Sequence, residues 1–169
     1  MTTTITGATG IDNIQAATGA VLQVVSTTKS DTFVSATTSF LDITGLSVSI
    51  TPTSTSSKIL VIVSVNHSDS TERSYVRLMR GSTAIGIGDA AGNRVRMSGS
   101  SVHNMTTYSI YNSAFNHLDS PSTTSSTTYK IQARSLGGSV YINRSEADRD
   151  TADYEERTIS TITVMEIAG

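Results

Sequence analysis

The chain has 169 residues, no cysteine, a formal net charge of −2 and a charged fraction of 15%. This length allows one domain with a substantial core, and the absence of cysteine excludes disulfides and thiolate metal sites. The nearly balanced charge argues against electrostatic binding of nucleic acid, and no apolar stretch is long enough for a membrane-spanning helix.

Residues 1–19 differ from the rest of the chain, because glycines interrupt them and no hydrophobic period runs through them. Asp12 is a candidate helix cap. A segment that stays in water would leave three large apolar side chains exposed, those of Ile5, Ile11 and Ile14. We therefore predict an N-terminal arm that packs on a neighbouring protein, and an unstructured tail is the alternative.

From residue 20 onward the sequence is typical of β-strands, with Thr, Val and Ile enriched and Gly or Pro at the breaks. Short apolar alternations at such spacing predict an antiparallel sandwich or barrel and no helix. The expected strands cover residues 20–27, 32–41, 46–50, 58–65, 74–80, 83–88, 94–97, 108–115, 128–134, 140–142 and 158–169.

The longest apolar run lies at residues 59–63, with the sequence ILVIV. Such a run is expected to be buried on both faces, in the centre of a sandwich or against another subunit. With so little charge elsewhere, we expect identical chains to share a core that one chain cannot fill.

The segment of residues 86–92 (GIGDAAG) contains three glycines but lacks the G-x-G-x-x-G spacing of a dinucleotide-binding site. We therefore predict a structural turn there. His67, His103 and His117 fall in polar, loop-like contexts. No pair of them has the spacing of metal ligands. We predict no catalytic residue, no metal ligand and no cofactor.

Residues 146–156 are the one charge-dense stretch. The carboxylates of Glu146, Asp148 and Asp150 could supply oxygen ligands for Ca²⁺, although the EF-hand spacing is missing. Arginines are interleaved with them, so ion pairs within the loop or between subunits explain the stretch as well. Both alternatives stay open.

The last stretch, residues 158–169, alternates almost to the C-terminus. One side carries Ile159, Thr161, Thr163, Met165 and Ile167, and the other carries Ser160, Ile162, Val164 and Glu166. Period two indicates a strand with two unlike faces. A terminal strand is ordered when it is tied into a sheet, so we expect it beside strands from far earlier in the sequence.

Several of these segments resemble known virion proteins. Residues 39–52 (SFLDITGLSVSITP), 58–62 (KILVI), 133–145 (ARSLGGSVYINRS) and 160–167 (STITVMEI) resemble virion structural proteins of tailed bacteriophages. Residues 9–15 (TGIDNIQ) are similar to segments that precede the head domains of phage fibres. The strand order is similar to that of trimeric jelly rolls of the C1q/TNF type, whose last strand is also central.

The resemblance implies an all-β, antiparallel jelly-roll sandwich over residues 20–169 that forms a homotrimer. Its expected trimer interface consists of Ile59, Val61, Val63, Met165 and Ile167. The arm, residues 1–19, is expected to attach to other virion proteins of the capsid or tail. The attachment residues would be Ile5, Ile11, Asp12 and Ile14.

The function implied is that of a non-enzymatic structural protein on the surface of a phage virion, made in the cytoplasm of the host bacterium. A capsid decoration or cement protein is the first expectation. The alternative is a receptor-binding tail fibre or spike tip, which would contact a host-surface receptor or glycan. Neither role involves nucleic-acid binding or membrane insertion.

Overall fold

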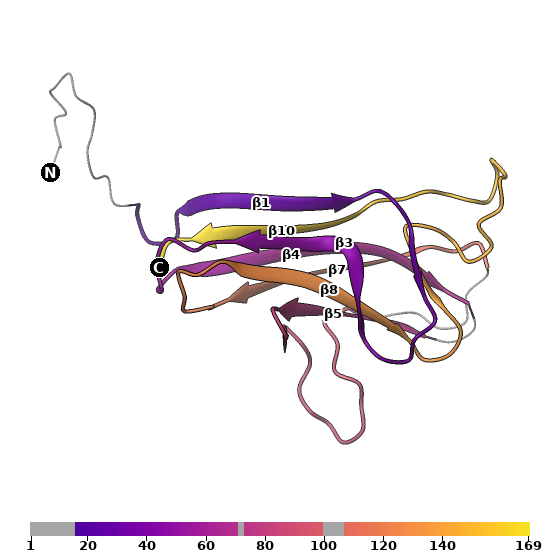
Figure 1. Ribbon diagram of the computed structural model, residues 1–169, viewed down its shortest axis with the longest axis horizontal. Helices are drawn as coiled ribbons and strands as arrows, with labels where there is room; N and C mark the ends of the chain where they lie inside the picture. Colours follow the sequence, from indigo (N-terminus) through magenta and orange to yellow (C-terminus); the bar gives the residue numbers. More distant parts are fainter. Residues whose placement is uncertain (1–15, 71–72, 100–106) are drawn as a thin grey trace, which may run out of the picture.

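The computed structural model describes residues 16–70, 73–99 and 107–169, and ten strands lie within them (Figure 1). The strands form two antiparallel sheets that pack face to face. No described residue lies in a helix, and so none of these residues belongs to a helix that could span a membrane. The predicted all-β, antiparallel sandwich of the jelly-roll type is confirmed.

The larger sheet has six strands, and its last strand in sequence lies near its centre. Its order is β1 (Val21–Lys29), β10 (Ser160–Ile167), β4 (Lys58–Asp69), β9 (Val140–Ile142) and β2 (Phe33–Ser35), with β7 (Tyr111–Asp119) also paired to β4. Strand β10 therefore pairs on both sides with strands from the first half of the chain, as predicted.

The smaller sheet has four strands. Its order is β3 (Leu41–Ile50), β8 (Thr127–Ser135), β5 (Ser74–Arg80) and β6 (Thr83–Ile85). The pairing of β3 with β8 shifts register between Asp42 and Ser47, and Gly45 adopts a φ of 81° inside this irregularity. Glycine adopts such a backbone without steric cost, so β3 can bend there.

The core lies between the two sheets and is filled by side chains of this one chain. Ile162 and Val164 from β10 are fully buried, as are Leu78 and Ile131 from the smaller sheet. Tyr129 is also fully buried, and its hydroxyl donates a 2.6 Å hydrogen bond to the Asp119 carboxylate. This chain therefore completes its own core, contrary to the expectation of a core shared between chains.

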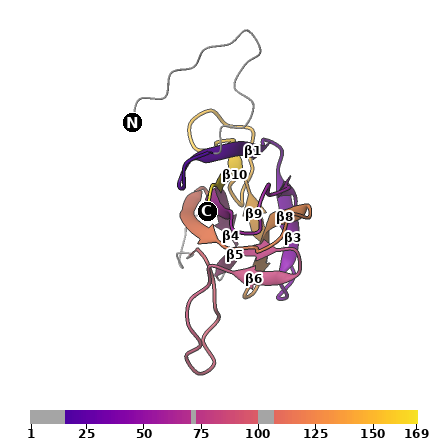
Figure 2. The ribbon, with the colours of Figure 1, turned by 90° about the vertical axis from the view of Figure 1, so that its left-hand side faces the viewer.

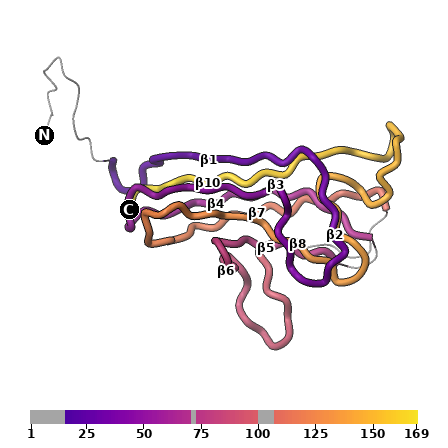
Figure 3. The backbone as a smooth tube through the Cα atoms, in the orientation of Figure 1, coloured from indigo at the N-terminus to yellow at the C-terminus, as the bar shows by residue number. Residues whose placement is uncertain are grey.

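Several strand predictions change in the structure: the strand expected at 83–88 ends at Ile85, and the strand expected at 108–115 is found at Tyr111–Asp119. Residues 94–97, expected as a strand, lie in the connection between β6 and β7, which has no strand over residues 86–98. This connection projects away from the sandwich (Figures 2 and 3). The expected strand at 32–41 is reduced to the short β2, because residues 36–40 bend toward the other sheet.

The sandwich has two distinct ends. The backbone amide of Gly19 donates to Ala168 O, and that of Ala168 donates to Ala20 O, both at 2.8 Å. These bonds hold the start of the described chain beside the C-terminus. The connection between β9 and β10 lies at the opposite end (Figure 1).

Candidate interaction surfaces

The outer face of the larger sheet carries apolar side chains in register across four strands. Val24 of β1 lies opposite Met165 of β10, Met165 lies opposite Leu60 of β4, and Leu60 lies opposite Leu118 of β7. We call Val24, Met165, Leu60 and Leu118 the apolar row. Val24 is 55% exposed and Leu118 is 50% exposed, so the row faces solvent in the isolated chain.

The next positions along the same face extend the row without adding charge. Ile62, which is 41% exposed, lies between Thr163 and Asn116. The row beyond it reads Thr28, Thr161, Ser64 and Ala114. At these positions the sheet presents a face without formal charge, roughly 14 Å wide from β1 to β7 at the usual strand spacing.

The outer face of the smaller sheet is different, because it carries a ladder of polar contacts. Asp42 accepts hydrogen bonds from Lys130 at 2.6 Å and from Gln132 at 2.7 Å. Gln132 in turn accepts a 2.9 Å bond from Arg77, whose guanidinium lies 3.9 Å from the Phe40 ring centroid. These groups already satisfy one another, so this face does not require a partner.

The predicted interface residues separate onto two faces. Ile59, Val61 and Val63 are at most 1% exposed and belong to the chain's own core. Their assignment to a subunit interface is therefore corrected, since a second chain cannot reach them. Met165 and Ile167 lie on the opposite, outward side of the larger sheet, and their role in an interface stays a prediction.

Glu166 lies between Met165 and Ile167 in β10, but its side chain is on the other side of the strand and is a fully buried carboxylate. It accepts hydrogen bonds from Gln23 Nε2 at 2.6 Å and from Thr53 N and Oγ1 at 2.7 Å each. Burial alone would raise the pKa of Glu166, but these donors outweigh burial and lower it to about 2. The carboxylate thus joins β1, β10 and the β3–β4 loop at the end of the sandwich where the termini meet.

His67 is buried in β4 rather than placed in a polar loop. Its Nδ1 lies 2.8 Å from Ser74 Oγ and its Nε2 lies 2.9 Å from Ser113 Oγ. Ser74 Oγ also donates to an Asp69 carboxylate oxygen at 3.4 Å. Burial lowers the pKa of His67 to about 4, and the ring is a neutral part of the interior.

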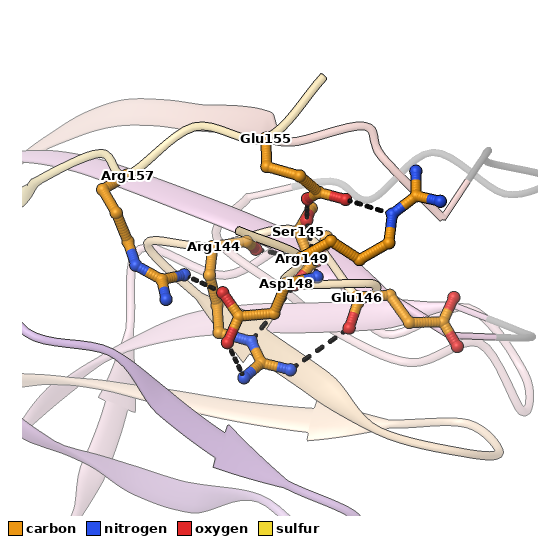
Figure 4. A network of polar contacts seen from close by, with 8 residues as sticks. Arg144, Ser145, Glu146, Asp148, Arg149, Glu155 and Arg157 are labelled. Carbon is orange, nitrogen blue, oxygen red and sulfur yellow. Dashed lines mark hydrogen bonds and ion pairs between the residues drawn. The ribbon is translucent and has the colours of Figure 1, made fainter. Parts of the chain in front are cut away.

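The charged segment between β9 and β10 forms a network of ion pairs within one loop (Figure 4). Arg144 pairs with Asp148 at 2.6 Å, and Arg157 pairs with the other oxygen of Asp148. Arg149 pairs with Glu155 at 3.4 Å, and the Ser145 hydroxyl donates to Glu155. Hydrogen bonding from Arg157, aided by Arg144, lowers the pKa of Asp148 despite partial burial.

The alternative of ion pairs within the loop is therefore realised in the structure, and two of the carboxylates are engaged by arginine. Among the described residues, no group of three His, Cys, Asp or Glu side chains could hold a metal ion.

Asn143 anchors the start of this loop. It is fully buried and adopts a φ of 62°, a conformation that asparagine tolerates better than most residues. Its Nδ2 donates to Lys29 O at 2.8 Å and to Asp31 O at 3.0 Å, and its Oδ1 accepts from Ser160 Oγ at 2.6 Å. One side chain therefore fixes the loop to the ends of β1 and β10.

The proposed attachment residues Ile5, Ile11, Asp12 and Ile14 lie outside the described residues. His103 lies outside them as well. His117 is half-buried in β7, where its ring would contact a Cβ added at Gly86.

No protein-family model matches the chain, and no curated protein matches its sequence. Among solved structures, the chain is similar to the VP2 subviral particle of infectious bursal disease virus. The identity is 15% and the TM-score 0.41, over 86% of this chain and 40% of that one. It is also similar to the structure of the Gt strain of the same virus, with 15% identity and a TM-score of 0.42, over 96% of this chain and 46% of that one.

The chain thus spans less than half the length of these two viral chains. At such distance the likeness assigns no role, and we infer the role of the chain from its own surfaces.

Proposed function

We propose that this chain is a non-enzymatic structural subunit of a phage virion surface that assembles as a homotrimer through the outer face of its larger sheet. The observation that carries the proposal is the apolar row, which crosses β1, β10, β4 and β7 in register. Contiguous exposed apolar side chains mark interaction sites in soluble proteins.

A second copy of the chain is the partner that fits this face. Copies related by a symmetry axis bring like residues near one another, so a charged face would repel itself. The cross-strand rows of this face, from the apolar row that starts at Val24 to the row that ends at Ala114, contain no charged residue. Burial of such a face contributes about 25 cal/mol per Å² of apolar surface.

The virion assignment is supported by the resemblance of four strand segments to phage virion proteins. Residues 1–19 are assigned as the arm that docks on another virion protein, since the chain leaves the sandwich beside the C-terminus. A capsid decoration or cement protein is the form that we favour. Its synthesis would take place in the host bacterial cytoplasm, and residues 20–169 would form the trimerisation domain.

A receptor-binding fibre or spike tip is the second candidate. The observation that favours it is a pair of exposed tyrosines: Tyr154 lies in the β9–β10 loop, which is at the end away from the termini, and Tyr108 lies beside Tyr154.

Sedimentation of the full chain tests the assembly. We expect the wild-type chain to sediment as a trimer at micromolar concentration. A variant with Ile62→Asp and Leu118→Asp should sediment as a folded monomer, because both carboxylates would have to be buried against other chains. Deletion of residues 1–15 should leave the trimer intact, since the arm is assigned to a different partner.

The matched control places the same two charges on the outer face of the smaller sheet, as Ser47→Asp and Ser49→Asp. This variant should remain a trimer. A wild-type chain that stays monomeric, or a control that dissociates as readily as the double variant, would refute the assigned interface.

A further inference from the structure

A hollow of about 430 Å³ lies against the β9–β10 loop and is lined by Tyr108, Arg149, Thr151 and Tyr154. The two tyrosine rings are 6.1 Å apart between centroids and are tilted by 44°. Tyr154 is 65% exposed and Tyr108 is 38% exposed. Two aromatic rings thus border one open hollow without contributing to the core.

Contacts within the loop hold this arrangement in place. The Arg149 guanidinium lies 4.3 Å from the Tyr108 ring centroid and also pairs with Glu155. Glu155 is in turn bound by the Ser145 hydroxyl, and the backbone amide of Ala147 donates to Thr107 O at 3.0 Å. The segment before β7 and the β9–β10 loop are therefore joined, and the aromatic surface is preorganised.

A second hollow of about 270 Å³ adjoins the first and shares Arg149 and Thr151 with it. It adds Asp148, Asp150, Glu155, Glu156 and Arg157. Two of these carboxylates are engaged by arginine, whereas Asp150 and Glu156 have no ion pair among the described residues. Four carboxylates against two arginines give the rim a net charge of −2.

We propose that these joined hollows bind a neutral saccharide. A pyranose has one flat face of C–H groups, which suits an exposed aromatic ring, and hydroxyls around its edge. Those hydroxyls would donate to the carboxylates of Asp150 and Glu156, since hydrogen bonds to charged acceptors are the stronger ones. The negative rim repels acidic sugars.

Other ligand classes fit less well. An anionic ligand would meet the excess of carboxylates, and Arg149 is already held by Glu155 and Tyr108. A purely apolar ligand would have to desolvate the charged rim, which costs free energy without a compensating bond. A neutral polyhydroxylated ring uses both the aromatic surface and the acceptors.

The site lies within a single chain, so it does not depend on the proposed trimer. The β9–β10 loop that carries it lies at the end opposite the termini (Figure 1), which suits contact with an external glycan. A failure of saccharide binding and a failure of assembly are therefore separate results.

Saturation-transfer NMR on the full chain tests the proposal. The probes are the methyl glycosides of glucose, galactose, mannose and N-acetylglucosamine, with glucuronic acid and N-acetylneuraminic acid as charged comparators. We expect saturation of ring protons of at least one neutral glycoside and weaker transfer to both acids. Tyr154→Ala should reduce the transfer at least tenfold, because it removes the more exposed stacking surface.

Tyr75→Ala is the matched control. Tyr75 also stacks with an arginine, Arg134, whose guanidinium lies 4.9 Å from its ring centroid, but on the smaller sheet. This variant should bind as the wild type does. The proposal is overturned when no neutral glycoside receives saturation, when the acids are preferred, or when a folded Tyr154→Ala variant binds normally.

Discussion

His67 is the side chain that should make this fold sensitive to mild acid. It is 2% exposed, both ring nitrogens are occupied by hydroxyls, and burial lowers its pKa to about 4 from 6.5. In the unfolded chain the imidazole binds a proton at a higher pH than in the folded chain. Its contribution to stability is therefore complete above pH 6.5 and is lost as the pH falls toward 4.

The free energy of unfolding should fall by about 3 kcal/mol between pH 7 and pH 4 on account of His67. Urea unfolding at several pH values measures this directly. The His67→Gln variant should be less stable than the wild type at pH 7. Above pH 4.5, however, its free energy of unfolding should depend much less on pH. Below that pH the protonation of Glu166 adds a second loss, because its folded pKa is about 2.

The matched variant is His117→Gln, which alters a half-buried histidine on the neighbouring strand β7. It makes the same chemical change, histidine to glutamine, outside the buried site of His67. An equally steep profile in His67→Gln would contradict the assignment to His67.

Among the strands, β10 was predictable because its alternation is complete and each face has its own composition. The run at Ile59–Val63 misled for a related reason, since apolar content on both faces does not show which face meets the core. Only the register with β10 reveals that Ile59 neighbours Glu166 and Leu60 neighbours Met165. The pairing of two strands that lie about a hundred residues apart leaves no signal in the local sequence of either strand.

The candidate sites were less predictable than the strands for the same physical reason. Tyr108 and Tyr154 are 46 positions apart in the sequence, and only the fold brings them together. The interleaved arginines of residues 144–157 did favour ion pairs within a loop, because their spacing places opposite charges a few residues apart. The burial of His67 left no local signal beyond the alternation of β4.

The connection between β6 and β7 projects from the sandwich, and its return to the sheet depends on a close approach at Gly99. A Cβ added there would lie 2.9 Å from Val76 Cγ2, 3.1 Å from Ser113 Cβ and 3.2 Å from the Phe115 ring. Gly99→Ala should therefore destabilise the fold by about 1–3 kcal/mol, which is typical of overpacking. Thermal or urea unfolding measures this loss.

Gly88 offers the control within the same connection. No atom of the described residues lies within 4 Å of a Cβ added there, and its backbone is not left-handed. Gly88→Ala should change the free energy of unfolding by less than about 0.5 kcal/mol. Equal effects of the two substitutions would show that the connection is not anchored at Gly99.

For the sandwich as an assembly unit, the decisive feature is that one chain fills its own core. Leu46, Leu78, Tyr129, Ile131 and Ile162 are all fully buried without a partner. The proposed association would therefore use the complete outer surface of a folded chain rather than an unfilled part of its interior. A monomer should be a folded species, and assembly should add stability through the apolar row.

If one chain folds on its own and assembly only adds stability, the response of thermal stability to protein concentration can be predicted. Because unfolding of the proposed trimer would also release its chains, a tenfold rise in concentration should add about 1 kcal/mol per chain and raise Tm by about 2–4 °C. The Ile62→Asp and Leu118→Asp double variant should unfold cooperatively at a lower Tm that does not change with concentration. Circular dichroism melts over a hundredfold range of concentration measure both behaviours.

If the double variant were unfolded at every concentration while Ser47→Asp with Ser49→Asp melted normally, the chain would depend on its neighbours for folding. The self-sufficient core inferred from burial would then be wrong.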